Sequence, residues 1–229
     1  MQFSSAIKRN LGEADWFLIV ANLLPVYGVW YLGWNAKQIF LVYCLETIII
    51  GVFTLLKLGI ATAIRKNDWW ENRGSRTMMH GAFFMMFFLL HYGFFVVIQM
   101  SLFLGASSIG DGNAPTVLQL LMYPYQYIGP DGLLLLCVFV FGYGYENLAG
   151  FLLRREYRTK SFMRIMFEPY LRIFIQQFVV ILGGFFLALG GGKFFIVVFA
   201  ASKIFFTIFL DYESILNKTI RKGAFSGKQ

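Results

Sequence analysis

Residues 38–60 read QIFLVYCLETIIIGVFTLLKLGI, a run in which Glu46 and Lys57 are the only charged side chains. An α-helix rises about 1.5 Å per residue, and the hydrocarbon core of a bilayer is about 30 Å thick. A helix over this run is therefore long enough to cross a membrane. The stretch predicts a transmembrane helix, and the rest of the sequence is best understood from it.

Five further apolar runs of similar length accompany this one, at 16–34, 80–104, 133–152, 170–190 and 194–213. Hydrophobic residues make up 58% of the chain and charged residues only 14%, so a soluble domain is excluded. We predict an all-α, polytopic transmembrane bundle of six helices over 16–213. A cytoplasmic arm over 1–15 and a basic cytoplasmic tail over 214–229 are expected to flank it.

Lysine and arginine residues are distributed unequally between the loops. With the N-terminus inside, only Lys37 and Lys193 of the 20 basic residues fall in outside loops, and Lys57, Arg172 and Lys203 fall within helices. The remaining fifteen lie inside, which is the positive-inside pattern. We expect a multi-pass protein of the cell inner (cytoplasmic) membrane with both termini cytoplasmic. The inside charge also indicates contact with an anionic cytoplasmic leaflet.

Two loops carry features of their own. The outside loop 105–132 contains an apolar stretch too short to span a bilayer, which favours a short surface or re-entrant helix. The inside loop 65–76 mixes both charge signs around Trp69 and Trp70. It is expected to be an interfacial connector with its tryptophans at the headgroups.

Polar and ionisable residues inside membrane helices are costly and commonly face the bundle interior, where they pair or line a pathway. Candidates for a ligand or ion pathway here are Glu46, Lys57, His91, Glu146, Asn147, Arg172, Gln176, Lys203 and Asp211. Most of these fall in the inner half of the predicted helices. Structural ion pairs with snorkelling helix-end groups are one interpretation, and a cytoplasm-facing polar cavity is the other.

Lys203 is the least easily explained of these residues because it lies near the middle of its predicted helix. A buried lysine needs a counter-group, and Glu146, Glu46 or a histidine is expected to provide it. Glu146 is in turn predicted to face protein, within reach of Lys57, Arg172 or Lys203.

Several other functions are not supported by the sequence. Cys44 and Cys137 both lie in apolar runs, so no disulfide framework or thiol metal site is expected. His80 and His91 lie about three helical turns apart, too far to share one metal ion. No catalytic triad motif is present, and no basic run interleaved with aromatics indicates nucleic-acid binding.

Four stretches together resemble an uncharacterised prokaryotic integral membrane family, domain of unknown function 6498: NLLPVYGVWYLGW (22–34), YCLETIIIGVFTLLK (43–57), HYGFF (91–95) and the EPYLRI…VILGGF…K…LD pattern over 168–211. The resemblance implies that Glu46, His91, Arg172, Lys203 and Asp211 match the family pattern. It implies no activity. A histidine is implied where this chain has Gln177, so a metal site from His91 and that position is not expected.

Three functions remain open. The first is translocation of a small solute, an ion or protons through the ionisable cluster. The second is a non-catalytic scaffold subunit of a larger complex, as a homo- or hetero-oligomer. The third is an intramembrane lipid-modifying enzyme with Glu46, His91 or Glu146 as acid or base. An enzyme is the less expected class, and the sequence indicates no cofactor.

Overall fold

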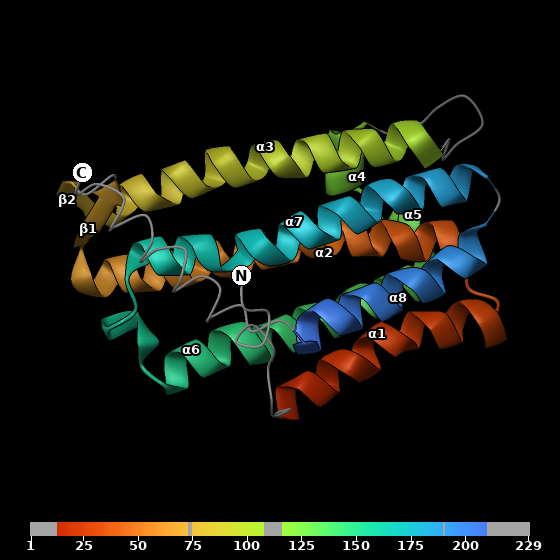
Figure 1. Ribbon diagram of the computed structural model, residues 1–229, viewed down its shortest axis with the longest axis horizontal. Helices are drawn as coiled ribbons and strands as arrows, with labels where there is room; N and C mark the ends of the chain where they lie inside the picture. The colour runs from red at the N-terminus through yellow and green to blue at the C-terminus, as the bar shows by residue number, and fades with distance from the viewer. Residues whose placement is uncertain (1–12, 73–74, 108–115, 190, 210–229) are drawn as a thin grey trace.

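The computed structural model describes residues 13–72, 75–107, 116–189 and 191–209 (Figure 1). Its helical elements are α1 (Glu13–Tyr31), α2 (Ala36–Arg65), α3 (Gly81–Ser107), α4 (Val117–Met122), α5 (Pro124–Tyr143), the π-helix η2 (Gly144–Ala149), α6 (Gly150–Leu153), the 3-10 helix η3 (Glu156–Arg158), α7 (Phe162–Ala188) and α8 (Gly192–Phe209). Two strands, β1 (Asn67–Asn72) and β2 (Ser75–His80), complete the described elements.

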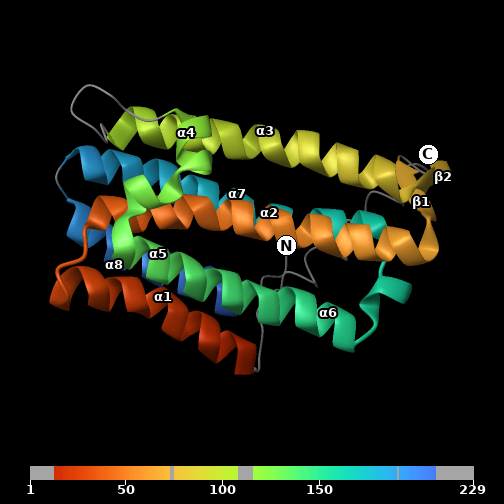
Figure 2. The ribbon, with the colours of Figure 1, turned by 180° about the vertical axis from the view of Figure 1, so that it is seen from behind.

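The long helices lie side by side along the longest axis of the molecule and alternate in direction along the chain (Figures 1 and 2). Helix α2 occupies the centre, where it contacts α3, α5, α7 and α8, while α1 packs on α8. Every residue of α2 from Ile39 to Thr47 is buried. Burial of consecutive helical residues requires neighbours on all sides, because 3.6 residues complete a turn. The quoted apolar run is thus the central helix of the bundle.

Local sequence accounts for both ends of α2. Asn35 caps its start, with the side-chain oxygen accepting from the backbone nitrogens of Lys37 and Gln38 at 2.9 and 3.4 Å. Its end is marked by Lys66, which has a positive φ of 63° and donates its backbone N–H to the carbonyl of Thr62. The observed helix, Ala36–Arg65, extends the predicted span 38–60 at both ends.

The loop after α2 is a β-hairpin, so the all-α prediction is wrong over residues 67–80. Strands β1 and β2 pair in antiparallel register, with Trp69 opposite Met78 and Trp70 opposite Thr77. Aromatic and β-branched residues favour strands, and Glu71 faces Arg76 across the ladder in an ion pair of 3.4 Å. The ring of Trp70 packs on Phe83, Phe84 and Phe87 of α3.

The fourth long helix begins at Pro124, nine residues before the predicted span 133–152. Gly129 adopts φ 65° and ψ −177° just before Pro130, which breaks the helical backbone there. The stretch predicted as an outside loop therefore contains α4 and the first turns of α5. Further along, the α-helix continues directly into η2, a π-helical segment, and then into α6.

Three helices in the described ranges are long and apolar enough to cross a membrane: Ala36–Arg65, Gly81–Leu102 and Pro124–Leu153. A shorter apolar helix covers Ile19–Tyr31. The described residues do not support the full set of six predicted crossings. Large apolar side chains nevertheless cover the outer surface, with Leu153 81% and Leu90 69% exposed. Such a surface is typical of a protein whose solvent is a bilayer.

Candidate functional site

A buried carboxylate lies at the centre of the bundle. Glu46 of α2 is 1% exposed, and its two oxygens each have a partner from a different helix. The Tyr143 hydroxyl at the end of α5 donates to Glu46 Oε1 at 2.5 Å. The Lys203 ammonium of α8 donates to Glu46 Oε2 and forms an ion pair with it. We call these three residues the Glu46–Lys203 site.

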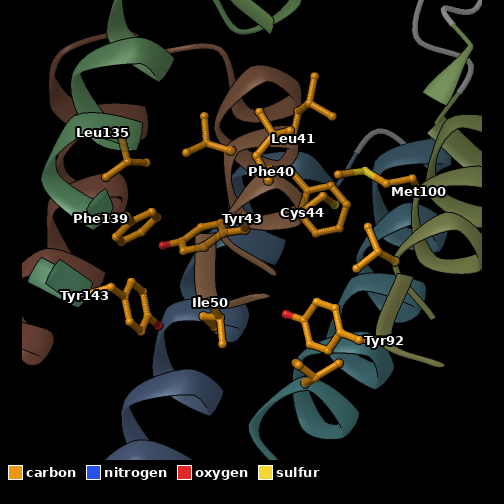
Figure 3. Packing of buried hydrophobic residues seen from close by; sticks show 14 of the residues in the cluster. Phe40, Leu41, Tyr43, Cys44, Ile50, Tyr92, Met100, Leu135, Phe139 and Tyr143 are labelled. Carbon is orange, nitrogen blue, oxygen red and sulfur yellow. The ribbon is translucent and has the colours of Figure 1, made fainter. Parts of the chain in front are cut away.

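Aromatic rings enclose the ammonium of this site. Lys203 Nζ lies 4.8 Å from the ring centroid of Tyr43 and 4.7 Å from that of Phe139. A cation over an aromatic face is attracted by the negative face of the ring, more strongly where water is excluded. Tyr43, Phe139 and Tyr143 gather between α2 and α5 in Figure 3, with Tyr92 and Met100 on the opposite side of α2. The pair is therefore held by ring faces as well as by charge.

A second ionic cluster lies near the hairpin end of the bundle. Lys57 Nζ of α2 lies 3.3 Å from Glu168 Oε2 of α7, and Lys160 Nζ lies 3.1 Å from the other oxygen of Glu168. Lys160 also pairs with Glu156 at 3.1 Å. We call Lys57, Glu156, Lys160 and Glu168 the inner ionic cluster. It ties α2 to the start of α7 and to η3.

The charges of the inner ionic cluster shift the pKa values of Glu168 and Lys160. Burial alone raises the pKa of Glu168, but the neighbouring ammonium groups of Lys57 and Lys160 outweigh burial and hold this pKa below its usual value. For Lys160, burial lowers the pKa, and the carboxylates of Glu168 and Glu156 outweigh it, so the net pKa is raised. Both shifts favour the charged forms, as expected for ion pairs that hold α2 and the start of α7 together.

A network around Asp68 anchors the hairpin beside this cluster. Asp68 Oδ2 accepts from the backbone N–H of Phe162 at 2.6 Å, which satisfies a free donor at the start of α7. Arg65 pairs with Asp68 at 3.5 Å and lies over the Phe162 ring at 4.4 Å. These contacts fix how the hairpin, α2 and α7 meet.

His91 lies apart from both charged groups, on the side of α3 next to α7. Its Nδ1 is 2.9 Å from the hydroxyl oxygen of Tyr170, and its ring stacks on Phe87 with centroids 5.5 Å apart. The imidazole is exposed. It shares no contact with Glu46, Lys57 or Lys203 in the described part of the chain.

The structure thus divides the candidate residues between two separate groups of contacts. Of the expected partners for Lys203, Glu46 is the one observed. Lys57 pairs with Glu168, which is absent from the candidate list. Asn147 lies in η2 and is half-buried. Glu146, also in η2, and Arg172 and Gln176, on α7, have side chains outside the described part of the structure, and Asp211 lies outside the described residues.

Sequence reasoning missed Tyr143 of the site and the two rings beside its ammonium, Tyr43 and Phe139. A signal was available for two of them, because a tyrosine within an apolar helix carries a hydroxyl that needs a partner when buried. Phe139 gave none, since a phenylalanine facing a cation looks the same in the sequence as one facing lipid.

The Glu46–Lys203 site combines an acid, a base and a hydroxyl in a space shielded from water. One proton moved from the Lys203 ammonium to the Glu46 carboxylate would neutralise both groups and end their attraction. Among the described residues, no group of three or more His, Cys, Asp or Glu side chains could hold a metal ion. The chemistry that this arrangement offers is proton exchange coupled to helix contact.

Comparison with known proteins gives one informative result. Neither the curated proteins nor the solved structures contain a match to the chain. A family model described as a family of unknown function, DUF6498, matches residues 6–220. Since this match covers nearly the whole sequence and both sites above, the chain belongs to the DUF6498 family.

Proposed function

We propose that this protein crosses the cytoplasmic membrane six times, with both termini in the cytoplasm, and translocates protons, alone or with a small solute. The observation that carries the proposal is the enclosed carboxylate Glu46, bonded at once to Lys203 and Tyr143 from two other helices. Charges buried in membrane helices commonly mark ion and proton pathways.

The depth of the pair supports this function. Glu46 lies ten residues after the start of α2 and Lys203 eleven after the start of α8, roughly 15 and 17 Å along their axes. Both helices begin at the end of the bundle opposite the hairpin (Figure 1). The two groups therefore lie well inside a bilayer of about 30 Å, away from either surface.

The contacts of the pair link the protonation of Glu46 to the arrangement of the surrounding helices. Protonation of Glu46 would weaken its attraction to Lys203, and with it the link between α2 and α8. Tyr143 stands directly before the π-helix η2, and such π segments inside α-helices are frequent at functional sites. With Glu46 1% exposed, the present conformation is a closed one, and transport requires α8 or η2 to shift.

A flux measurement tests this proposal. The full chain is reconstituted in liposomes that contain a pH-sensitive dye, and a potassium gradient with valinomycin provides a negative interior. We expect proton entry above that of protein-free liposomes for the wild type. Glu46→Gln should reduce entry to the protein-free rate, because the amide cannot take up a proton.

Glu71→Gln is the matched control, because Glu71 is also a paired carboxylate but lies in the hairpin, opposite Arg76. It should retain the wild-type flux. A wild type without flux, or a Glu46→Gln variant with unchanged flux, would contradict the proposal. The scaffold function would then be the better account of the ion pair.

A further inference from the structure

A polar side chain, His91, stands among exposed apolar side chains on the outer surface of the bundle. His91 lies on α3, which is long and apolar enough to cross a membrane. It follows the start of the helix by ten residues and precedes its end by sixteen, roughly 15 and 24 Å along the axis. Its imidazole is nevertheless exposed, and its neighbours Leu90 and Phe94 are 69% and 64% exposed.

Only one of the two imidazole nitrogens has a hydrogen-bond partner within the described part of the chain. Nδ1 is bonded to the Tyr170 hydroxyl, whereas Nε2 has no hydrogen-bond partner there. A polar nitrogen left without a partner in hydrocarbon is unfavourable, because no water is present to replace the missing bond. An apolar side chain at this position would avoid that penalty.

The ring is also held in a defined orientation. Phe87 stacks nearly parallel to it, at an interplanar angle of 12°, and Phe95 meets it edge-on with centroids 5.2 Å apart. The ring of Tyr170 lies 5.3 Å away on the α7 side. His91 is thus the polar member of an aromatic surface formed by α3 and α7, and it is fixed in place before any ligand binds.

We infer that the His91–Tyr170 pair binds the planar head of a lipid-soluble quinone that reaches it from the bilayer, on the outer surface that α3 and α7 share. Access from the acyl region requires an apolar tail, and the surrounding rings favour a flat head that can stack on them. Nε2 then supplies the single hydrogen bond that positions the head.

The hydrogen-bond chemistry of the pair matches both forms of such a head. When the Tyr170 hydroxyl donates to Nδ1, Nε2 carries the proton and donates to a quinone carbonyl. When Nδ1 donates to Tyr170 instead, Nε2 accepts from a quinol hydroxyl. A histidine whose second nitrogen is paired with a hydroxyl can therefore serve either form without moving.

Equilibrium binding of decyl-benzoquinone to the full chain in nanodiscs tests this inference. We expect saturable binding by the wild type that protein-free nanodiscs lack. His91→Phe keeps an aromatic ring of similar size but removes Nε2, so it should weaken binding by about two- to tenfold, the usual worth of one hydrogen bond. An azido-substituted quinone should crosslink to peptides of α3 or α7.

The second histidine of the chain provides a matched control. His80 ends β2 just before α3, about three helical turns ahead of His91, and its Nδ1 accepts from the backbone of Ala82 at 3.1 Å. His80→Phe should bind the quinone as the wild type does. Tyr170→Phe is a second test should His91→Phe not fold, since loss of the hydroxyl leaves the His91 tautomer unset and should weaken binding in the same range.

Three results would overturn the inference. The first is binding by His91→Phe, or by a folded Tyr170→Phe, equal to that of the wild type. The second is equal binding of decylbenzene, which has the same tail and a flat six-membered ring but no carbonyl, and which would show that the surface is merely apolar. The third is no saturable binding beyond protein-free nanodiscs. None of these depends on proton flux through Glu46, so the two proposals can fail separately.

Discussion

Glu46 and Lys203 are 157 positions apart in the chain, yet they form the best-enclosed ion pair among the described residues. Removal of two charges from water is unfavourable, and their mutual attraction and hydrogen bonds must compensate for it. Here Tyr143 supplies a further hydrogen bond, and the Tyr43 and Phe139 rings support the ammonium. Loss of one charge of the pair should therefore destabilise the fold more than loss of both charges.

Substitution of the pair tests this imbalance. Lys203→Met removes the ammonium that is paired with the buried Glu46 carboxylate and should destabilise the fold by about 3–5 kcal/mol. The double variant Lys203→Met with Glu46→Gln removes both charges and should lie closer to the wild type. Reversible unfolding in mixed micelles measures these differences in free energy.

Lys37→Met is the control for these variants, since Lys37 is exposed at the start of α2 and its loss should change stability by no more than about 0.5 kcal/mol. A single variant Lys203→Met as stable as the wild type would show that the Glu46–Lys203 pair does not stabilise the fold.

At the scale of elements, close packing of α2 against α3 depends on a glycine. A Cβ on Gly51 would lie 2.5 Å from Cε1 of Tyr92, a buried ring whose hydroxyl donates to the carbonyl of Thr47. Neither the ring nor the helix can withdraw easily. The absence of a side chain at Gly51 is thus what brings the two helices together.

Gly51→Ala should destabilise the fold by about 1–3 kcal/mol through overpacking. Gly93→Ala is the matched control, since Gly93 lies in α3 and, apart from the adjacent backbone of its own helix, no atom lies within 4 Å of the place that an added methyl group would occupy. This second variant should be neutral or stabilising by up to about 1 kcal/mol, because alanine is the better helix former. Equal effects of the two substitutions on thermal unfolding would refute the packing argument.

At the scale of the whole molecule, the two ends of the bundle differ in the number of basic residues that they carry. The hairpin end carries the inner ionic cluster together with Arg65, Arg76 and Lys66, whereas Lys37 lies at the opposite end, where α2 begins. By the positive-inside rule we expect the hairpin end to face the cytoplasm.

Cysteine accessibility in intact cells measures this orientation. In a background with Cys44→Ala and Cys137→Ala, an impermeant thiol reagent should label Lys37→Cys directly and Arg76→Cys only after the cells are opened. Both positions are exposed, so access to the reagent and not burial decides the outcome. Labelling of Arg76→Cys alone in intact cells would show that the topology is the reverse of the expected one.

Much of the architecture follows from local sequence. The length and apolarity of 38–60 identify the central helix, because helix rise and bilayer thickness are both constants that a single segment can be compared with. The hairpin is not predicted by the same comparison. Its two strands are short and carry charges, and β1 and β2 are strands only because they pair with each other. Strand pairing is a contact between segments, and a single-segment pattern does not reveal it.

The sequence by itself determined which residues had to find partners, since a charge within an apolar run is costly wherever it points. It did not determine the partners. Tyr143 reaches Glu46 across 97 positions and Glu168 reaches Lys57 across 111, contacts that depend on how far each helix is rotated and shifted against α2. Rotation and shift are decided by packing over whole helix faces, through glycines such as Gly51 and rings such as Tyr92. Only the tertiary structure therefore shows that Lys203 pairs with Glu46 and Lys57 with Glu168, in two separate clusters.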